Sequence, residues 1–303
     1  MTSSASRLEP RRTEDGSFSL FSAEFGEGFH SGRGALAEAH GKFVAPAGLE
    51  QLPPGSTLRV LDVCMGTGSN SAALLEHCQR LQLQLSWWGL ELDRQPLQLA
   101  LTDAGFRQQW QPQALAQLEQ LTSSERMLWG DARQRLPELL SSQRGQLDLV
   151  LMDAFSPSRC PQLWSLDFLG ALGQLLAPAG LLLTYCSAAA VRNALRLSGL
   201  EIASIAAPCG LQKHQSDWSG GTAASPGPLT GRPLLRPLTA MEEEHLRTNA
   251  AEPYRDPSGT ADRATILRQR QEAQRLAMQR GGVEGTSEWR RRWGVGKRPG
   301  EHQ

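Results

Sequence analysis

The chain has 303 residues, 40% of them hydrophobic, and carries 31 Lys and Arg against 31 Asp and Glu. This length and apolar content suit one large domain with appendages. No apolar run approaches the ~18 residues that a membrane span needs, and the N-terminus lacks the apolar core of a signal peptide, so we expect a cytoplasmic protein without membrane contact. The cysteines are scattered without a CxxC pair, which argues against a disulfide framework and against a metal site.

Four regions follow one another along the chain. Residues 1–17 are polar and charged and predict a disordered arm. Residues 18–56 form an apolar-periodic N-terminal appendage that ends at Pro53-Pro54-Gly55. Residues 57–227 form the main domain, and residues 228–303 form a proline-rich linker with a basic helical tail.

Strands and helices alternate throughout the main domain, which predicts a doubly wound α/β sheet. The expected strands are short apolar runs at 58–64, 85–90, 127–129, 147–152, 181–185, 201–206 and 221–225. The expected helices lie at 71–80, 95–104, 110–121, 133–140, 162–176 and 188–198.

The first strand, turn and helix carry the clearest functional signal. Residues 58–64 are mostly apolar, as in a strand that is buried on both faces. The turn Gly66-Thr67-Gly68 follows, and Ser69-Asn70-Ser71 provide helix caps. Glycines let a backbone approach a ligand closely, and a helix start offers free N–H groups, so this unit predicts nucleotide binding. A single glycine turn is a weak signal on its own.

Acidic residues follow three successive strands. They are Glu91, Asp131 and Asp153, and ligands of open α/β sheets bind beyond the carboxyl ends of the strands. Glu91 stands at the distance from the glycine turn at which such folds place a carboxylate on ribose hydroxyls. Asp131, in Gly130-Asp131-Ala132, suits an acceptor for an adenine amine. Each acid alone is more often a helix cap, but three in register favour a ligand site.

The chain has neither a P-loop string nor G-x-G-x-x-G, because Ser71 stands at the third glycine position. Two glycines and acidic strand ends resemble the S-adenosylmethionine-dependent methyltransferase class. Most members of that class have glycine where Cys64 stands. The resemblance implies S-adenosyl-L-methionine as cofactor, with these binding residues: Asp62, Gly66, Thr67, Gly68, Asn70, Glu91, Asp131 and Ala132.

Four motifs, in order over residues 18–225, resemble the methyltransferase domain of MnmC. They are Phe25-Gly26-Glu27 with His30-Ser31, Gly34-Ala35 and Glu38; Gly66-Thr67-Gly68-x-Asn70; Asp153-Ala154-Phe155-Ser156-Pro157 with Pro161-x-Leu163-Trp164; and Thr184-Tyr185-x-Ser187-Ala188-Ala189-x-Val191-Arg192. Residues 234–270 resemble an extension that only some relatives have.

The resemblance implies an enzyme that completes 5-methylaminomethyl-2-thiouridine at the tRNA wobble position, with tRNA as its partner. Many members carry a second, FAD-dependent oxidase domain. Because the stretch after Gly231 is short and contains no G-x-G-x-x-G, we expect no FAD and a stand-alone methyltransferase that acts on 5-aminomethyluridine.

The expected reaction is an in-line attack of a neutral primary amine on the sulfonium methyl group, accelerated mainly by positioning. Asp153 is the expected catalytic residue, because it ends the fourth strand beside the methyl donor and can orient the amine or take its proton. Tyr185 is the second expected catalytic residue. His30 is expected to contact the substrate and is, after Asp153, a further candidate for the same role.

The expected substrate contacts come from the loop after Asp153 and from one later loop. Phe155 and Trp164 can stack an extruded uracil, although they are equally typical of core aromatic residues. Ser156 and Pro157, also expected substrate-binding residues, fix the turn that follows Asp153. Lys213, with its neighbour His214, can meet tRNA phosphates.

Two other functions stay open from the sequence. An aminopropyltransferase or another small-amine methyltransferase would share this sheet, but the former normally shows paired aspartates where Ser156 stands. A non-catalytic, RNA-binding version of the fold is favoured only by Cys64. Residues 263–298 contain ten Lys and Arg against three acids, which is consistent with nucleic-acid contact or with a solvated helical tail.

Overall fold

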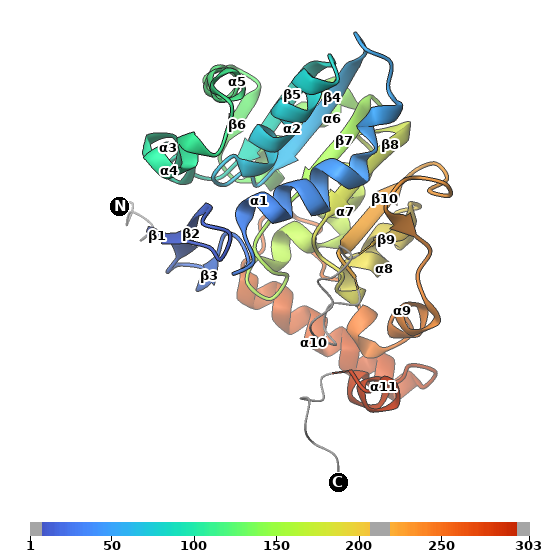
Figure 1. Cartoon of the computed structure of the whole chain (residues 1–303). Coiled ribbons are helices and arrows are strands. Elements are labelled where there is room, and N and C mark those ends of the chain that lie inside the picture. Colours follow the sequence, from blue (N-terminus) through green and yellow to red (C-terminus); the bar gives the residue numbers. More distant parts are fainter. Residues whose placement is uncertain (1–7, 207–218, 296–303) are drawn as a thin grey trace.

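The central sheet has eight strands in the order β11-β9-β10-β8-β7-β4-β5-β6 in the computed structural model, which describes residues 8–206 and 219–295 (Figure 1). The strands β4 to β8 pair in parallel, whereas β10 pairs antiparallel with both β8 and β9. The strand bounds are β4 Thr57–Val63, β5 Gln84–Glu91, β6 Met127–Trp129, β7 Leu147–Met152, β8 Leu176–Thr184, β9 Glu201–Ile205, β10 Gly221–Ser225 and β11 Leu235–Arg236. The expected doubly wound α/β sheet is confirmed.

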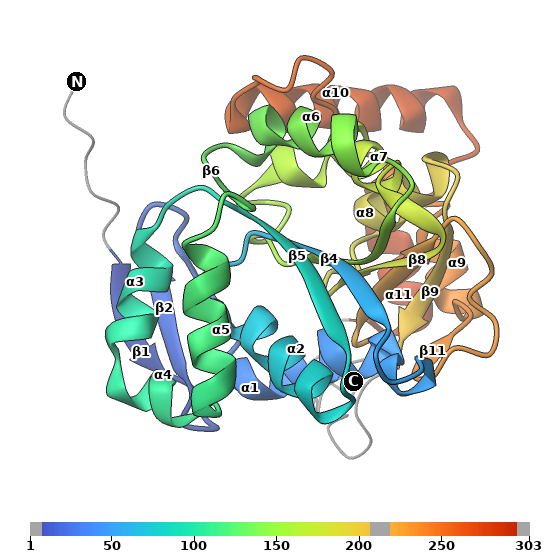
Figure 2. The same cartoon turned by 90° about the horizontal axis from the view of Figure 1, so that it is seen from above.

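Helices cover both faces of this sheet (Figure 2). One face carries α1 Ala35–Glu38, the π-helical turn η1 Ala39–Val44, α2 Ser69–Arg80, α3 Gln95–Thr102, α4 Ala104–Gln108 and α5 Pro112–Thr122. The other carries α6 Ala132–Gln143, α7 Leu166–Gly173, α8 Ala189–Leu197 and α10 Arg263–Arg280. Short 3-10 turns lie at Ala45–Ala47, Leu49–Gln51, Pro161–Trp164 and Asn249–Ala251. In the part of the chain that the structure describes, no helix has the length and apolar character to cross a membrane.

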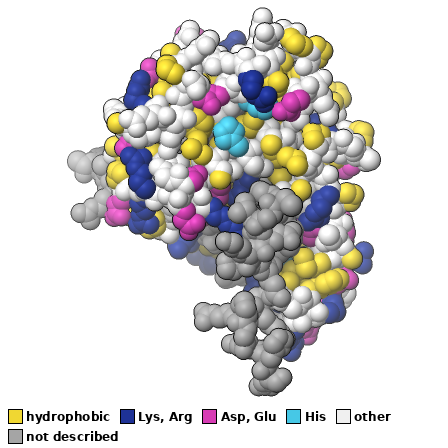
Figure 3. All heavy atoms as spheres, in the orientation of Figure 1, with side chains coloured by type: hydrophobic (Ala, Val, Ile, Leu, Met, Phe, Trp, Pro, Cys, Tyr) yellow, Lys and Arg dark blue, Asp and Glu magenta, His cyan; other side chains and the backbone are white. Residues whose placement is uncertain are grey.

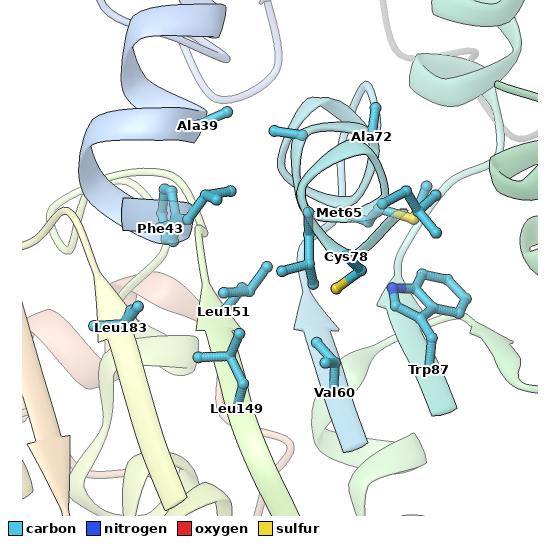
Figure 4. Packing of buried hydrophobic residues seen from close by; sticks show 14 of the residues in the cluster. Ala39, Phe43, Val60, Met65, Ala72, Cys78, Trp87, Leu149, Leu151 and Leu183 are labelled. Atoms are coloured by element: carbon cyan, nitrogen blue, oxygen red, sulfur yellow. The ribbon is translucent and has the colours of Figure 1, made fainter. Parts of the chain in front are cut away.

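Two apolar clusters, one on each face, form the core. Figure 4 shows the first, in which Phe43 of η1 and Cys78 of α2 lie over Val60, Leu149 and Leu151 of the central strands. Residues at neighbouring positions of β4 point to opposite faces of the sheet, so Val60 joins this cluster and Leu61 joins the second. This explains why β4 is apolar without alternation.

The expectation of a disordered arm over 1–17 is wrong for residues 8–17. Residues Leu8–Arg12 form β1, which pairs antiparallel with β2 Phe18–Ser22, and β3 Glu27–Gly28 completes a small sheet. The polar composition was misleading because most side chains of this edge strand are exposed. Arg12 also forms a bidentate ion pair with Asp103 at 2.8 and 2.9 Å, which ties β1 to the main domain. Residues 1–7 lie outside the described part.

The expected helix 162–176 is interrupted. A 3-10 turn spans Pro161–Trp164, Ser165 caps α7 through the N–H of Phe168, and α7 ends at Gly173. The strand that follows begins at Leu176 rather than Leu181 and runs through Pro178-Ala179-Gly180. Gly180 permits this path because a Cβ there would lie 2.4 Å from the Leu147 carbonyl oxygen.

The central sheet continues past the expected boundary at residue 227. Strand β11 pairs antiparallel with β9, and α9 Ala240–His245 and α11 Thr286–Trp293 accompany α10. The buried Glu242 of α9 forms ion pairs with Arg192 of α8 at 2.9 Å and with Arg236 at 2.6 Å. Burial alone would raise the pKa of Glu242, but hydrogen bonds from Arg236 and Thr239 and the charge of Arg192 lower it to about 2.

Replacing Glu242 with Ala is expected to destabilise the protein by about 3–5 kcal/mol, because it leaves Arg192 buried without its counter-charge. The matched control is Glu243→Ala, which breaks the half-exposed pair with Arg196 and is expected to cost about 0–1 kcal/mol. Urea unfolding of both variants measures the difference. Equal effects would mean that α9 does not depend on the buried pair.

Candidate active site

A cavity of about 1060 Å³ opens at the carboxyl ends of β4, β5 and β7. The loops after these strands form one side of it, and the N-terminal appendage, from Phe25 to Lys42, forms the other. Its volume exceeds that of a typical small-molecule pocket, so it has room for a nucleoside cofactor and a second reactant.

Glu91 lies at the end of β5 and holds the glycine turn. Its carboxylate accepts the Gly66 N–H at 2.7 Å, the Leu92 N–H at 2.7 Å and the Asp93 N–H at 3.3 Å. Burial raises the pKa of Glu91, and these hydrogen bonds oppose that rise. Gly66 has a φ of +57°, which a glycine adopts without strain. The carboxylate is thus oriented at the cavity wall, as a ribose acceptor needs.

Asp131 combines the two roles that the sequence left open. It caps α6 by accepting the Arg133 N–H at 3.0 Å, and it pairs with the Arg133 guanidinium at 2.7 Å. It also lines the cavity, together with Gly130 and Ala132. The residue that caps α6 therefore also lines the cavity, and its contact with a ligand stays a prediction.

The other expected cofactor residues support the turn from inside the protein. Asp62 is fully buried and accepts the Ser71 hydroxyl at 2.6 Å, and burial raises its pKa to about 7. The Thr67 hydroxyl bonds Ser69 at 2.8 Å, and a Cβ on Gly68 would crowd Leu97 at 3.1 Å. Asp62, Thr67, Gly68 and Asn70 are not among the residues that line the cavity, and their contribution to cofactor binding stays a prediction.

Cys64, at the position where the resemblance led us to expect glycine, has a φ of +61°. This left-handed conformation costs a non-glycine residue about 1–2 kcal/mol. Cys64 lines the cavity, and burial raises the pKa of its thiol, so the side chain is protonated and uncharged. The chain thus retains the turn geometry at an energetic cost.

Asp153 follows β7 and lines the cavity. Its Oδ2 accepts a hydrogen bond from Asn70 Nδ2 at 2.7 Å. Burial, and then the nearby charge of Glu38, raise its pKa to about 7, whereas Asn70 and Lys42 act in the opposite direction. A carboxyl group with this pKa exchanges protons readily near neutral pH.

Sequence reasoning gave no role to Glu38 and Lys42, which line the cavity opposite Asp153. Glu38 accepts hydrogen bonds from the Ser31 hydroxyl at 2.5 Å and from Lys42 Nζ at 2.9 Å. The sequence contained a signal for this pair, because an acidic and a basic residue four positions apart share one face of a helix.

Tyr185 and His30 also line the cavity. The Tyr185 hydroxyl donates to the Ala154 carbonyl at 2.9 Å, and burial raises its pKa further. His30 Nδ1 bonds the Ser19 hydroxyl at 3.0 Å, and burial lowers its pKa to about 4. His30 is therefore neutral at pH 7.

The aromatic residues after Asp153 differ in their exposure. Phe155 lines the cavity and stacks on Phe25 at 4.6 Å between ring centroids, with the edge of Phe29 at 5.0 Å. Trp164 is fully buried and donates its indole N–H to the Phe155 carbonyl at 2.7 Å. The expectation that Trp164 stacks a base is wrong, because the 3-10 turn directs this side chain into the core.

The turn at Ser156 and Pro157 is tied to the appendage. Ser156 donates its N–H and its hydroxyl to Glu27, at 3.0 and 2.8 Å. Glu27, like Glu38, belongs to the first family-like motif, and sequence reasoning missed this contact. Pro157 is half-buried beside it. Lys213 and His214 lie outside the described residues.

A family model described as S-adenosyl-L-methionine-dependent methyltransferase matches residues 100–212. The bifunctional tRNA 5-methylaminomethyl-2-thiouridine biosynthesis protein MnmC of Aromatoleum aromaticum is 28% identical over 223 residues, which are 64% of this chain and 33% of that protein. An uncharacterized protein of Methanocaldococcus jannaschii is 30% identical over 190 residues, 60% of this chain and 51% of that protein. This chain thus spans between a third and a half of these relatives.

A solved structure is also similar. The crystal structure of MNMC2 from Aquifex aeolicus superposes with a TM-score of 0.69 at 27% identity. The match covers 88% of this chain and 84% of the Aquifex chain. It therefore extends well beyond the stretch that the family model recognises.

Replacing Glu91 with Gln is expected to weaken the binding of S-adenosylhomocysteine about tenfold to a hundredfold. The change removes one charged acceptor in a buried site, which is worth about 1.5–3 kcal/mol. Calorimetric titration measures the affinity, with Glu119→Gln on the exposed side of α5 as the control. An unchanged affinity in folded Glu91→Gln protein would contradict the ribose role.

Proposed function

We propose that this chain, which carries an MnmC-like, S-adenosyl-L-methionine-dependent methyltransferase domain, methylates the 5-aminomethyl group of the wobble uridine in tRNA. The amine nitrogen attacks the methyl carbon of the sulfonium, and the N–C bond forms as the C–S bond breaks. The bonding electron pair passes to sulfur and yields S-adenosylhomocysteine, and the nitrogen loses one proton.

One observation supports this proposal above the others. Asp153 lies in the cavity with a pKa raised to about 7 by burial and by Glu38. An aliphatic amine is mostly protonated at pH 7, so methyl transfer needs a nearby group that orients it and takes its proton. Glu38 is paired with Lys42, whereas a deprotonated Asp153 has no such ion pair among the described residues and suits a cationic amine, which supports an amine as the acceptor.

The choice of tRNA rests on the relatives. Their name refers to tRNA 5-methylaminomethyl-2-thiouridine biosynthesis, and the four motifs of this chain resemble the methyltransferase domain of MnmC. Those proteins are bifunctional and longer than this chain, so the proposal covers the methyl transfer alone.

The direct test incubates the purified protein with S-adenosylmethionine and tRNA that carries 5-aminomethyl-2-thiouridine. Mass spectrometry of the digested nucleosides is expected to show conversion to the 5-methylaminomethyl form. Polyamines, with either S-adenosylmethionine or its decarboxylated form, serve as rival substrates. Conversion of a polyamine but not of tRNA would overturn the choice of substrate and favour a small-amine transferase.

Replacing Asp153 with Asn is expected to lower turnover by about 10²–10⁴, the usual contribution of a positioned acid or base. Because Asp153 must be deprotonated to act, the wild-type rate is expected to rise with pH through about 7. The variant is expected to lose the rise in rate near pH 7 that belongs to Asp153. At higher pH its rate is expected to recover in part, because more of the substrate amine is then neutral. Single-turnover methylation of tRNA measures both effects.

Thermal melting of the same variant separates catalysis from structure. The pKa of Asp153 is about 7 in the folded protein, whereas its ordinary value is 3.8. The folded protein therefore binds the carboxyl proton more tightly than the unfolded chain does. As the pH rises from 3.8 to about 7, this difference lowers the stability of the fold. Asp153→Asn removes that cost and is expected to melt no lower than wild type at pH 8. A lower melting temperature with normal turnover would assign Asp153 a purely structural role.

The basic tail is proposed to contribute tRNA affinity through only some of its cations. Arg270 donates to the carbonyls of Glu252 and Ala250, and Arg292 pairs with Glu244 and Glu284, so these two serve the fold. Figure 3 shows Lys and Arg side chains interspersed with acidic ones on the face that it draws. Arg263 and Arg275 are exposed but donate to Ser158 and pair with Glu272, and four further arginines are exposed as well: Arg268, Arg280, Arg290 and Arg291.

Replacing those four arginines with Ala is expected to flatten the dependence of tRNA affinity on salt. Each lost phosphate contact lowers the slope of log K against log salt by about 0.7–0.9. The control replaces Arg107 and Arg144, which are exposed elsewhere on the domain. Filter binding over a range of salt concentrations measures the slopes. An unchanged slope for the variant with four substitutions would show that these arginines do not contact tRNA phosphates.

A further inference from the structure

Arg133 directly follows Asp131 and Ala132, which line the cavity, and it connects Asp131 to a second carboxylate. Its Nε and Nη2 donate to the Asp131 carboxylate at 3.1 and 2.7 Å. Its Nη1 turns the other way and donates to Asp256 Oδ2 at 2.7 Å and to the Ala261 carbonyl at 2.9 Å. A guanidinium is a rigid planar fork, so its contacts on one side fix the direction of its contacts on the other.

Asp256 is itself immobilised. It is buried, and its second oxygen accepts the Ser258 hydroxyl and the Ala261 N–H, both at 3.1 Å. A buried carboxylate is stable only when it is paired and hydrogen-bonded, and this one has both kinds of partner. The Arg133 guanidinium therefore meets a fixed anion on the side away from the cavity.

Residues 254–263, which we call the strap, are anchored to α6, to α7 and to the loop after Asp153. Gln134 of α6 donates to the Gly259 carbonyl at 2.8 Å. Arg255 pairs with Asp167 of α7 at 3.0 Å, and Arg263 donates to the Ser158 carbonyl at 3.0 Å. Figure 2 shows α10, which follows the strap, on the same side of the sheet as α6 and α7, and α10 contacts the 3-10 turns Pro161–Trp164 and Asn249–Ala251.

We propose that Asp256 is a positioning residue that acts through Arg133 to hold the Asp131 carboxylate toward the 6-amino group of the cofactor's adenine. The strap is then part of the cofactor site and sets its selectivity for a 6-aminopurine. This inference rests on the expected role of Asp131 but not on the identity of the methyl acceptor, since it concerns binding without tRNA.

The test compares two ligands by calorimetric titration. One is S-adenosylhomocysteine, and the other is its 6-deamino analogue, in which hydrogen replaces the exocyclic amine. The wild-type protein is expected to prefer the first by about tenfold to a hundredfold, the value of a hydrogen bond to a charged group. Asp256→Asn is expected to reduce that preference several-fold through weaker binding of S-adenosylhomocysteine, with the analogue unaffected.

Two further variants keep the test decisive if Asp256→Asn folds poorly. Arg133→Lys keeps the charge but loses the fork, and it is expected to lose the same selectivity. Gln134→Ala cuts a neighbouring strap contact that does not reach Asp131, and it is expected to retain the wild-type preference. The double variant Asp131→Ala/Asp256→Asn is expected to show the same ligand preference as Asp131→Ala alone. If Asp256 acts only through Asp131, its substitution has no further effect on the preference once Asp131 is gone.

Several outcomes would overturn the proposal. Equal loss of affinity for both ligands in Asp256→Asn and Arg133→Lys would make the strap a purely structural brace. A wild-type protein that does not distinguish the ligands would remove the role of Asp131, and with it that of Asp256. Neither result bears on methylation of tRNA, which is measured separately.

Discussion

The position of β4 between β5 and β7 is the constraint on which the active site depends. Val63 pairs with Leu90 on one side and with Met152 on the other, so all three strands end at the same level. The residues that follow therefore emerge together. They are Cys64, Glu91 and Asp153. Parallel pairing thus brings groups that are up to 89 residues apart in the chain into one cavity wall.

Much of this arrangement was predictable, because it follows from strand periodicity. Apolar runs identified the strands, and the acids placed after them do line the cavity. The errors arose where long-range packing decides. From the sequence, Trp164 could stack a base, yet in the structure it is buried and its indole N–H donates to a backbone carbonyl inside the core. From the sequence, we expected residues 8–12 to be disordered. In the structure they form a strand that pairs with β2, and an ion pair between Arg12 and Asp103 holds it in place.

The buried carboxylates at this edge oppose stability. Burial raises the pKa values of Asp62, Glu91 and Asp153, so keeping them charged in the folded protein costs free energy. Hydrogen bonds from Ser71, the Gly66 N–H and Asn70 limit that cost. A cationic cofactor and a cationic amine would compensate further, because they supply the missing positive charge. The site is thus arranged for its ligands at the expense of the free protein, a common conflict between activity and stability.

The C-terminal region shows why net charge is a limited guide to function. The sequence reveals that this region is basic, but not that Arg270 already serves backbone carbonyls or that Arg236 and Arg192 share the buried Glu242. A cation bound in this way is not available to a phosphate. The same anchoring makes residues 254–263 a common support, because they contact α6 beside Asp131 and Ser158 beyond Asp153. A change in that support would therefore reach both α6 and the loop after Asp153.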